Sequence, residues 1–206
     1  MRVVIVLGGD PPGSVLMDWR IKGADFSIAA DAGMQVFVAE ELEPDLLIGD
    51  LDSFDPSQES LSCEIARIRD QGQTDFQKAL ARPELQDADE VVVLGGTGGR
   101  SDHFLNNLLI AAGLPGTVKV IFDADMEIIY RVTPERPLAL EDLDGQTVSI
   151  IPMGDCTGVS ASGLRWPLAQ VAMGSGNSLS QSNLAVAERV EVCLDQGTLY
   201  VVVLKH

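Results

Sequence analysis

Residues 90–112 have the sequence EVVVLGGTGGRSDHFLNNLLIAA, and this stretch decides the fold. A run of β-branched and apolar residues predicts a buried strand at Glu90–Leu94. Four glycines in the next five positions predict a tight turn, and a helix is expected at Asp102–Ala112. A buried strand, a turn and a helix in immediate succession are typical of an α/β protein with a parallel sheet.

The same alternation continues on both sides of this stretch. Further strands are expected at Val3–Leu7, Phe26–Ala30, Leu46–Ile48 and Val118–Phe122, and further helices at Ala32–Leu42 and Asp75–Ala81. Parallel strands joined by helices form right-handed crossovers, which place helices on both faces of the sheet. We therefore predict a doubly wound, mostly parallel, Rossmann-like α/β domain over residues 1–125.

A different pattern follows this domain. Strands without helices between them are expected at Met126–Val132, Thr147–Pro152, Arg189–Leu194 and Thr198–Leu204. The Asp195–Gly197 segment predicts a hairpin loop between the last two strands, and residues 173–183, rich in Gly, Ser and Asn, predict a long loop. We predict a smaller all-β antiparallel domain over residues 126–206, either a sandwich or a partial barrel.

Composition excludes several classes of protein. The chain of 206 residues has 14 Lys and Arg against 31 Asp and Glu, a net charge of −17, which disfavours nucleic acid as a partner. Its apolar runs are far shorter than the ~18 residues of a membrane-spanning helix. Three widely spaced cysteines indicate neither a disulfide framework nor a zinc site. These features predict a cytoplasmic protein that does not interact with membranes.

Carboxylates gather where the predicted parallel strands end, which is the ligand-binding edge of such a sheet. Asp31 follows one strand, Asp50 and Asp52 follow the next, and Asp75 begins a helix. A turn at Gly49 could direct Asp50 and Asp52 toward one hard cation such as Mg²⁺. The alternative is that these aspartates are turn residues with Ser53 as a helix cap, and that Thr74 or Asp75 caps its helix.

The glycine-rich turn is a second candidate site. Backbone amides around Gly98 and Gly99 could approach an anion closely, with Arg100 pairing to phosphate oxygens. The alternative is a flexible loop that ends in a helix cap at Ser101 or Asp102. Lys78, one turn after Asp75, either neutralises phosphate charge near the metal or forms an exposed ion pair. The first glycine loop, residues 8–13, is interrupted by two prolines, so we do not expect a nicotinamide cofactor there.

Together these segments resemble the thiamine pyrophosphokinase family. The resemblance is carried, in order, by Asp31-Ala32-Gly33, Pro44–Ser53, Thr74–Leu80, Gly98–His103 with Asn107, Gly163–Leu168 and Ser182-Asn183. It departs from the family's usual residues at Ala32, Met34, Gln181 and Leu184. It implies transfer of a diphosphate group from ATP to thiamine, giving thiamine diphosphate and AMP, in a homodimer with shared active sites.

The resemblance also implies roles for single residues. Metal ligands would be Asp31, Asp50, Asp52 and Asp75 for Mg²⁺, and the catalytic residues would be Asp50, Asp52, Asp75 and Arg100. Substrate-binding residues would be Asp31, Gln73, Thr74, Lys78, Gly98, Gly99, Arg100, Asp102, His103, Asn107, Trp166, Ser182 and Asn183. Residues 1–125 would bind ATP and metal, and residues 126–206 would bind thiamine and form the dimer. Trp166 could lie on the cationic thiazolium ring, or it could be a core tryptophan of the second domain.

Other functions stay open at this level. A related diphosphokinase acting on a hydroxymethyl pterin would share the carboxylates and differ near Trp166 and Ser182-Asn183. A regulator could bind thiamine diphosphate without turnover, although the complete carboxylate set argues against it. A metal-dependent phosphatase is a weaker option.

Overall fold

The computed structural model describes residues 1–58, 61–177 and 180–205 and divides the chain into two compact units. Unit 1 contains Met1–Ile110 and Phe122–Asp125, and unit 2 contains Ala111–Ile121 and Met126–His206. The segment 111–121, which the sequence led us to place with the α/β domain, therefore groups with unit 2. The boundary passes through α4 (Ser101–Ala112) and β6 (Lys119–Asp123).

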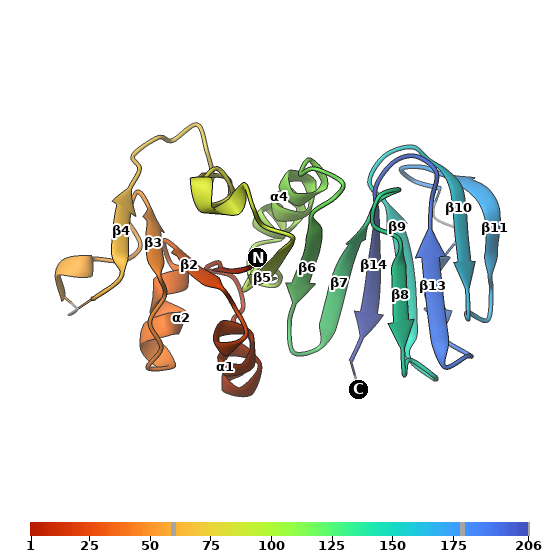
Figure 1. Cartoon of the computed structure of the whole chain (residues 1–206), viewed down its shortest axis with the longest axis horizontal. Coiled ribbons are helices and arrows are strands. Elements are labelled where there is room, and N and C mark those ends of the chain that lie inside the picture. The colour runs from red at the N-terminus through yellow and green to blue at the C-terminus, as the bar shows by residue number, and fades with distance from the viewer. Residues whose placement is uncertain (59–60, 178–179, 206) are drawn as a thin grey trace. The chain divides into compact units, whose positions relative to one another are not determined.

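Unit 1 is built on a parallel sheet (Figure 1). Its strands are β1 (Arg2–Val6), β2 (Phe26–Ala30), β3 (Leu46–Gly49), β4 (Glu64–Arg67) and β5 (Glu90–Leu94). They lie in the order β4-β3-β2-β1-β5, and every adjacent pair is parallel. The predicted parallel α/β architecture is confirmed. The strand order reverses between β1 and β5, which is where ligands bind in open sheets of this kind.

Helices connect these strands. They are α1 (Ser14–Lys22), α2 (Gly33–Ala39), α3 (Asp75–Leu80) and α4, with short 3₁₀ turns η1 (Pro56–Gln58) and η2 (Pro83–Leu85). α2 packs on β1 and β2, and α3 packs on β2 and β3. A core cluster that includes Val4, Phe37 and Leu47 fills the space between sheet and helices. Our sequence analysis missed α1 and β4, because neither shows a regular apolar pattern: β4 is an edge strand with mostly exposed residues.

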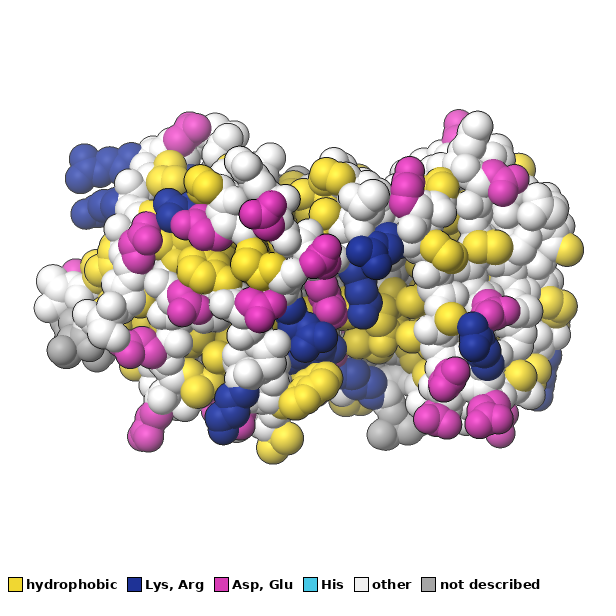
Figure 2. Space-filling model, in the orientation of Figure 1, with side chains coloured by type: hydrophobic (Ala, Val, Ile, Leu, Met, Phe, Trp, Pro, Cys, Tyr) yellow, Lys and Arg dark blue, Asp and Glu magenta, His cyan; other side chains and the backbone are white. Residues whose placement is uncertain are grey.

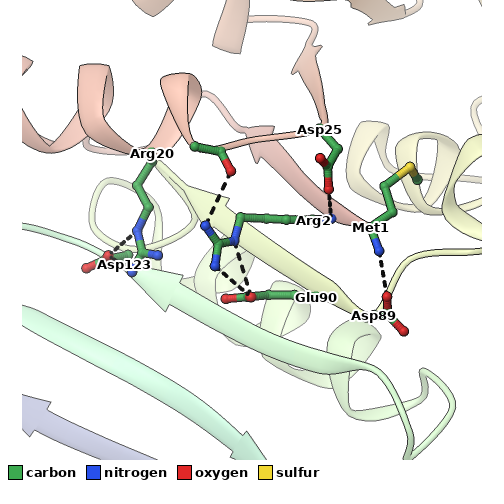
Figure 3. A network of polar contacts seen from close by, with 8 residues as sticks. Met1, Arg2, Arg20, Asp25, Asp89, Glu90 and Asp123 are labelled. Carbon is green, nitrogen blue, oxygen red and sulfur yellow. Dashed lines mark hydrogen bonds and ion pairs between the residues drawn. The ribbon is translucent and has the colours of Figure 1, made fainter.

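Polar contacts fasten the first strand of unit 1 (Figure 3). Arg2 donates to the Glu90 carboxylate from Nε and Nη2, both at 3.2 Å, and its backbone N–H donates to Asp25 at 2.7 Å. Arg20 of α1 forms a buried ion pair with Asp123 at the end of β6. These contacts join β1 to β5 and to the segment before β2, and they join α1 to β6.

Unit 2 is an antiparallel sandwich. Its strands are β7 (Glu127–Val132), β8 (Leu138–Glu141), β9 (Thr147–Pro152), β10 (Cys156–Ser162), β11 (Leu168–Met173), β12 (Ser180–Leu184), β13 (Arg189–Cys193) and β14 (Leu199–Leu204). One sheet has the order β12-β9-β14-β7 and the other β11-β10-β13-β8, and all these pairs are antiparallel. Apolar residues of both sheets share one core cluster, so the predicted sandwich is confirmed.

Two details of our prediction for unit 2 are wrong. β13 and β14 do not form a hairpin, because β13 pairs with β8 and β10 in one sheet while β14 pairs with β7 and β9 in the other. The Asp195–Gly197 segment instead crosses between the sheets, and Gly197 does adopt a positive φ of 102°. The long loop predicted at 173–183 contains the end of β11 and most of β12, and its residues 178–179 lie outside the described part.

Arg131 of β7 holds residues 111–118, the segment that joins the end of α4 to β6. Its side chain is buried and donates to four backbone carbonyls, those of Ala111, Leu114, Pro115 and Val118, at 2.6–2.8 Å. Carbonyl groups at the end of a helix carry partial negative charge and balance a buried guanidinium. Burial lowers the pKa of Arg131 from its usual value.

The net charge of −17 is visible on the surface. Figure 2 shows Asp and Glu side chains spread over the visible face, with fewer Lys and Arg side chains among them. None of the helices in the described part of the chain is long and apolar enough to cross a membrane.

Candidate active site

Asp31 lies where β2 ends and α2 begins. Its backbone adopts a left-handed φ of 43°, and its N–H donates to the Ile48 carbonyl at 2.8 Å, which ties it to the end of β3. Its side chain is buried, and within the described residues Oδ1 has no hydrogen-bond partner. Burial raises the pKa of this carboxyl group. A buried carboxylate oxygen without a partner is costly, so a positive ligand here would stabilise it.

A turn at residues 50–53 brings two further carboxylates to Asp31. One oxygen from each of Asp31, Asp50 and Asp52 lies within 4.8 Å of the other two. The backbone between Asp50 and Asp52 is not extended, because Leu51 has a φ of 60°. The Asp52 N–H donates to Asp50 Oδ1 at 3.3 Å. Gly49 is the last residue of β3, so the turn that gathers both aspartates lies at Leu51 and not at Gly49 as expected.

Asp50 is held by residues that our sequence analysis did not single out. Gln71 Nε2 donates to Asp50 Oδ2 at 2.6 Å, and Arg67 Nε donates to the Asp50 carbonyl at 3.1 Å. The bond from Gln71 lowers the pKa of Asp50. Arg67 ends β4 and Gln71 lies in the loop after it. A prediction of β4 would have placed both residues at the same edge of the sheet as Asp50.

The start of α3 meets the same cluster. A Cβ atom built on Gly49 would lie 2.9 Å from Asp31 Cβ and 3.2 Å from Asp75 Oδ1, so only glycine allows these segments to approach so closely. Lys78 is buried and donates to Asp75 Oδ1 at 2.9 Å. The alternative of an exposed ion pair is therefore wrong for Lys78.

Thr74 and Gln73 precede α3. Thr74 is the helix cap: its Oγ1 accepts from Gln77 N–H at 3.2 Å, and its own N–H donates to Gln77 Oε1 at 3.0 Å. This reciprocal capping box confirms the capping alternative for Thr74. Gln73 is exposed.

The glycine-rich loop lies at the reversal point of the sheet. Gly98 and Gly99 have positive φ values of 71° and 58°, and the loops after β1 and β5 bond through Gly9 N–H to Gly95 O and Asp10 N–H to Thr97 O. A Cβ atom on Gly98 would lie 2.0 Å from Asp10 Oδ2. Asp10 thus packs against the candidate phosphate loop. The sequence analysis did not select Asp10, because it tested residues 8–13 only for a dinucleotide-binding motif.

Four more candidates lie just before or within the helix after this loop, which are Arg100, Asp102, His103 and Asn107. Arg100 pairs with Asp102 through Nε to Oδ1 at 3.1 Å and Nη2 to Oδ2 at 2.6 Å, and both side chains are exposed. The guanidinium lowers the pKa of Asp102 to about 2. Asn107 Nδ2 donates to the Gly96 carbonyl at 3.1 Å, which fixes the loop, and His103 is exposed.

The remaining candidates lie in unit 2. Trp166 is exposed over 56% of its surface, which contradicts the alternative of a core tryptophan. The Arg165 guanidinium carbon lies 5.8 Å from the centre of its ring. Asn183 is buried and bonds to the backbone of Trp166, while Ser182 is exposed with a φ of 55°.

The cluster of unit 1 has the donor set of a hard-cation site. Among the described residues it offers carboxylate oxygens from Asp31, Asp50 and Asp52, with Asp75 adjacent, and no sulfur or imidazole. Magnesium and similar ions prefer such oxygen ligands. A cation bound here would supply the partner that Oδ1 of Asp31 lacks among the described residues, so these residues fit the ion.

Comparison with known proteins connects both units to one family. The family model described as thiamin pyrophosphokinase, catalytic domain, matches residues 18–121, and the model described as thiamin pyrophosphokinase, vitamin B1 binding domain, matches residues 133–199. Thiamine pyrophosphokinase of Bacillus subtilis is 26% identical over 183 residues, which are 85% of each chain. Thiamine pyrophosphokinase 1 of rice is 28% identical over 178 residues, 80% of this chain and 67% of the relative.

Solved structures agree in fold. The crystal structure of thiamine pyrophosphokinase from Bacillus subtilis superposes with a TM-score of 0.83 at 22% identity, over 100% of this chain and 99% of the other. Thiamin pyrophosphokinase from Candida albicans gives a TM-score of 0.82 at 15% identity, over 100% and 89% of the two chains. With a carboxylate cluster in the matched catalytic part and a sandwich in the matched binding part, the chain belongs to the thiamin pyrophosphokinase family.

Proposed function

We propose that this protein is a thiamine diphosphokinase, which transfers the diphosphate group of ATP to the hydroxyl group of thiamine. In this reaction the hydroxyl oxygen of thiamine bonds to the β-phosphorus of ATP. The bond from that phosphorus to the oxygen bridging to the α-phosphorus breaks, and AMP leaves with the bridging oxygen. The observation that carries the proposal is the oxygen-rich cluster of Asp31, Asp50 and Asp52 within the part of the chain that matches the family's catalytic domain.

The cluster would hold Mg²⁺ through Asp31, Asp50, Asp52 and Asp75. A bound Mg²⁺ would supply positive charge to the phosphate oxygens of ATP. Phosphate transfer requires mainly positioning and neutralisation of charge, so the arrangement of the protein's own groups matters most. The bonds from Gln71 and Arg67 keep Asp50 in place for this role.

Cationic groups and backbone amides of unit 1 would bind the phosphates. Arg100 offers a planar guanidinium just before α4, and Gly98 and Gly99 add no side chains of their own to the turn. Lys78 offsets negative charge beside Asp75. The hydroxyl proton of thiamine would pass to one of the cluster carboxylates.

We further propose that the protein acts as a homodimer in the cytoplasm. Leu105 and Leu109 lie four residues apart on α4 and are 58% and 60% exposed, which supports a covered apolar face in an assembly. The free thiols of Cys63, Cys156 and Cys193 support a reducing compartment. Sedimentation of the wild type and of Leu105→Glu tests the dimer: the variant should sediment as a smaller species.

Release of AMP tests the reaction. Purified protein is incubated with ATP and MgCl₂, with and without thiamine, and with a chelator as control. We expect AMP and thiamine diphosphate only when thiamine and metal are both present. AMP formed with a hydroxymethyl pterin but not with thiamine would assign another acceptor, and release of inorganic phosphate without acceptor would overturn the transfer reaction.

A further inference from the structure

A β-bulge in β12 buries the side chain of Asn183. β12 pairs with β9 at Ser180↔Ile150 and again at Asn183↔Val148, so three steps along β12 match two along β9. Without the extra residue, Ser180 and Asn183 would point to opposite faces of the sheet. The bulge, in which Ser182 takes a φ of 55°, leaves Ser180 2% and Asn183 1% exposed. Bulges often re-aim a side chain next to a functional site.

The buried amide of Asn183 uses its full hydrogen-bonding capacity inside the protein. Its Oδ1 accepts from the N–H groups of Trp166 at 3.2 Å and Leu184 at 2.9 Å. Its Nδ2 donates to the Trp166 carbonyl at 2.7 Å and to Ser180 Oγ at 3.0 Å. An asparagine amide has two donor hydrogens and one oxygen with two lone pairs. No donor or acceptor of this side chain is therefore left for a substrate.

Two of these bonds engage both backbone polar groups of Trp166, its N–H and its carbonyl. Neighbouring backbone bonds, from Arg165 N–H to Leu184 O at 2.8 Å and from Val186 N–H to Gly163 O at 2.9 Å, hold the rest of the same segment. The Trp166 ring itself stays 56% exposed. Its backbone is thus fixed by a buried amide while its ring is presented to solvent, an arrangement that suits a flat binding surface.

We propose that Asn183 is a positioning residue that acts through Trp166 rather than a residue that touches substrate. It locks the Trp166 backbone so that the ring offers a preformed surface to a flat heteroaromatic ring of the acceptor. This inference rests on the proposed function for the identity of the acceptor, which is thiamine, but the lock itself is a property of unit 2 alone.

Fluorescence tests the lock without any turnover. Trp19 and Trp166 are the two tryptophans of the chain, so a Trp19→Phe background leaves Trp166 as the sole reporter. In this background, time-resolved anisotropy of Trp166 should show slow rotation with the whole protein. Adding Asn183→Ala should introduce a fast local component, whereas adding Gln181→Ala, at an exposed neighbour in β12, should not. Unchanged anisotropy in a folded Asn183→Ala variant would overturn the lock.

A double-mutant cycle separates positioning from contact. Asn183→Ala and Trp166→Ala should each raise KM for thiamine between ~2-fold and ~30-fold, the range expected for loss of one ring contact, with KM for ATP unchanged. If Asn183 acts through Trp166, the double variant should be no worse than Trp166→Ala alone. Multiplying effects would show that Asn183 contacts thiamine directly and would overturn the proposal. If the wild type does not use thiamine, the proposed function fails, and the anisotropy result still decides the lock.

Discussion

Lys78 Nζ lies 2.9 Å from Asp75 Oδ1, with the lysine side chain only 2% exposed and the aspartate side chain 32% exposed. The buried ammonium group therefore lies beside the Asp75 carboxylate, and it lowers the pKa of Asp50 in addition to the larger effect of Gln71. In the absence of a metal ion, Lys78 offsets part of the negative charge of this cluster.

Lys78→Met should destabilise the metal-free protein. The substitution keeps the apolar stem and removes the charge, which leaves the carboxylates less balanced; because Asp75 is partly exposed, we expect a loss of ~1–3 kcal/mol rather than the full effect of a broken buried pair. Urea unfolding in chelator measures the loss, and excess MgCl₂ should reduce it. Lys22→Met removes a comparable but exposed pair with Asp18 and should cost less than ~1 kcal/mol. Equal effects of the two variants would refute this role of Lys78.

Asp52→Asn should abolish transfer and leave the fold intact. The amide keeps the size of the side chain and removes one charged oxygen ligand of the cluster, so we expect kcat to fall at least ~100-fold. AMP release measures the activity, and urea unfolding checks the fold. Asp18→Asn, at an exposed position on α1, serves as the control and should keep full activity. Normal turnover by a folded Asp52→Asn variant would remove Asp52 from the site.

Gly98→Ala should weaken the binding of ATP. Alanine at a φ of 71° is strained, and its Cβ would lie 2.0 Å from Asp10 Oδ2, so the loop and Asp10 must both shift. Gly145→Ala, at a φ of 82° with open space around it, carries the same backbone strain of ~1–2 kcal/mol without the clash. We expect KM for ATP to rise in Gly98→Ala only. A similar KM in both variants would mean that the shape of this loop does not matter for nucleotide binding.

Arg131→Met should unfold unit 2 more easily. Methionine fills similar space but leaves the carbonyls of Ala111, Leu114, Pro115 and Val118 without their donor, for which we expect a loss of at least ~3 kcal/mol. Arg136→Met removes one exposed bond, to the Thr117 carbonyl, and should cost less than ~1.5 kcal/mol. Chemical denaturation of both variants gives the comparison, and a small loss for Arg131→Met would contradict the bracing role.

Asp102 should titrate at an unusually low pH. The bond from Arg100 lowers its pKa from 3.8 to about 2, so the pair stabilises the fold above pH ~4 and loses this effect as the pH falls through about 2. NMR of the Asp102 carboxyl carbon should show this midpoint, and Arg100→Gln should return it toward 3.8. An unchanged midpoint in the variant would show that the pair does not form in solution.

The parts of the fold with a regular apolar pattern could be predicted from the sequence. The buried strands β2 and β5 were predicted with their observed bounds, because four of the five residues in each are fully buried and apolar or small. β4 was missed because an exposed edge strand needs no apolar alternation. β12 was missed because its bulge breaks the two-residue period and places polar Ser180 and Asn183 inside.

The candidate site was predictable to the extent that it depends on which residues end the strands. The carboxylates Asp31, Asp50 and Asp52 follow β2 and β3, and parallel strands bring these ends together. The contacts of Gln71, Asp10 and Asn183 were not predictable, since they depend on an unrecognised strand, on the meeting of two loops and on a bulge.

The position of β14 between β7 and β9 has a consequence for synthesis on the ribosome. β7 and β9 emerge many residues before β14, yet they are joined in the sheet only through residues 199–204, which pair with both of them. Unit 1, whose last residue is Asp125, could fold while the chain is still being made. Until β14 is made, the edges of β7 and β9 that it will pair with stay open. A chaperone would be of most use at this stage.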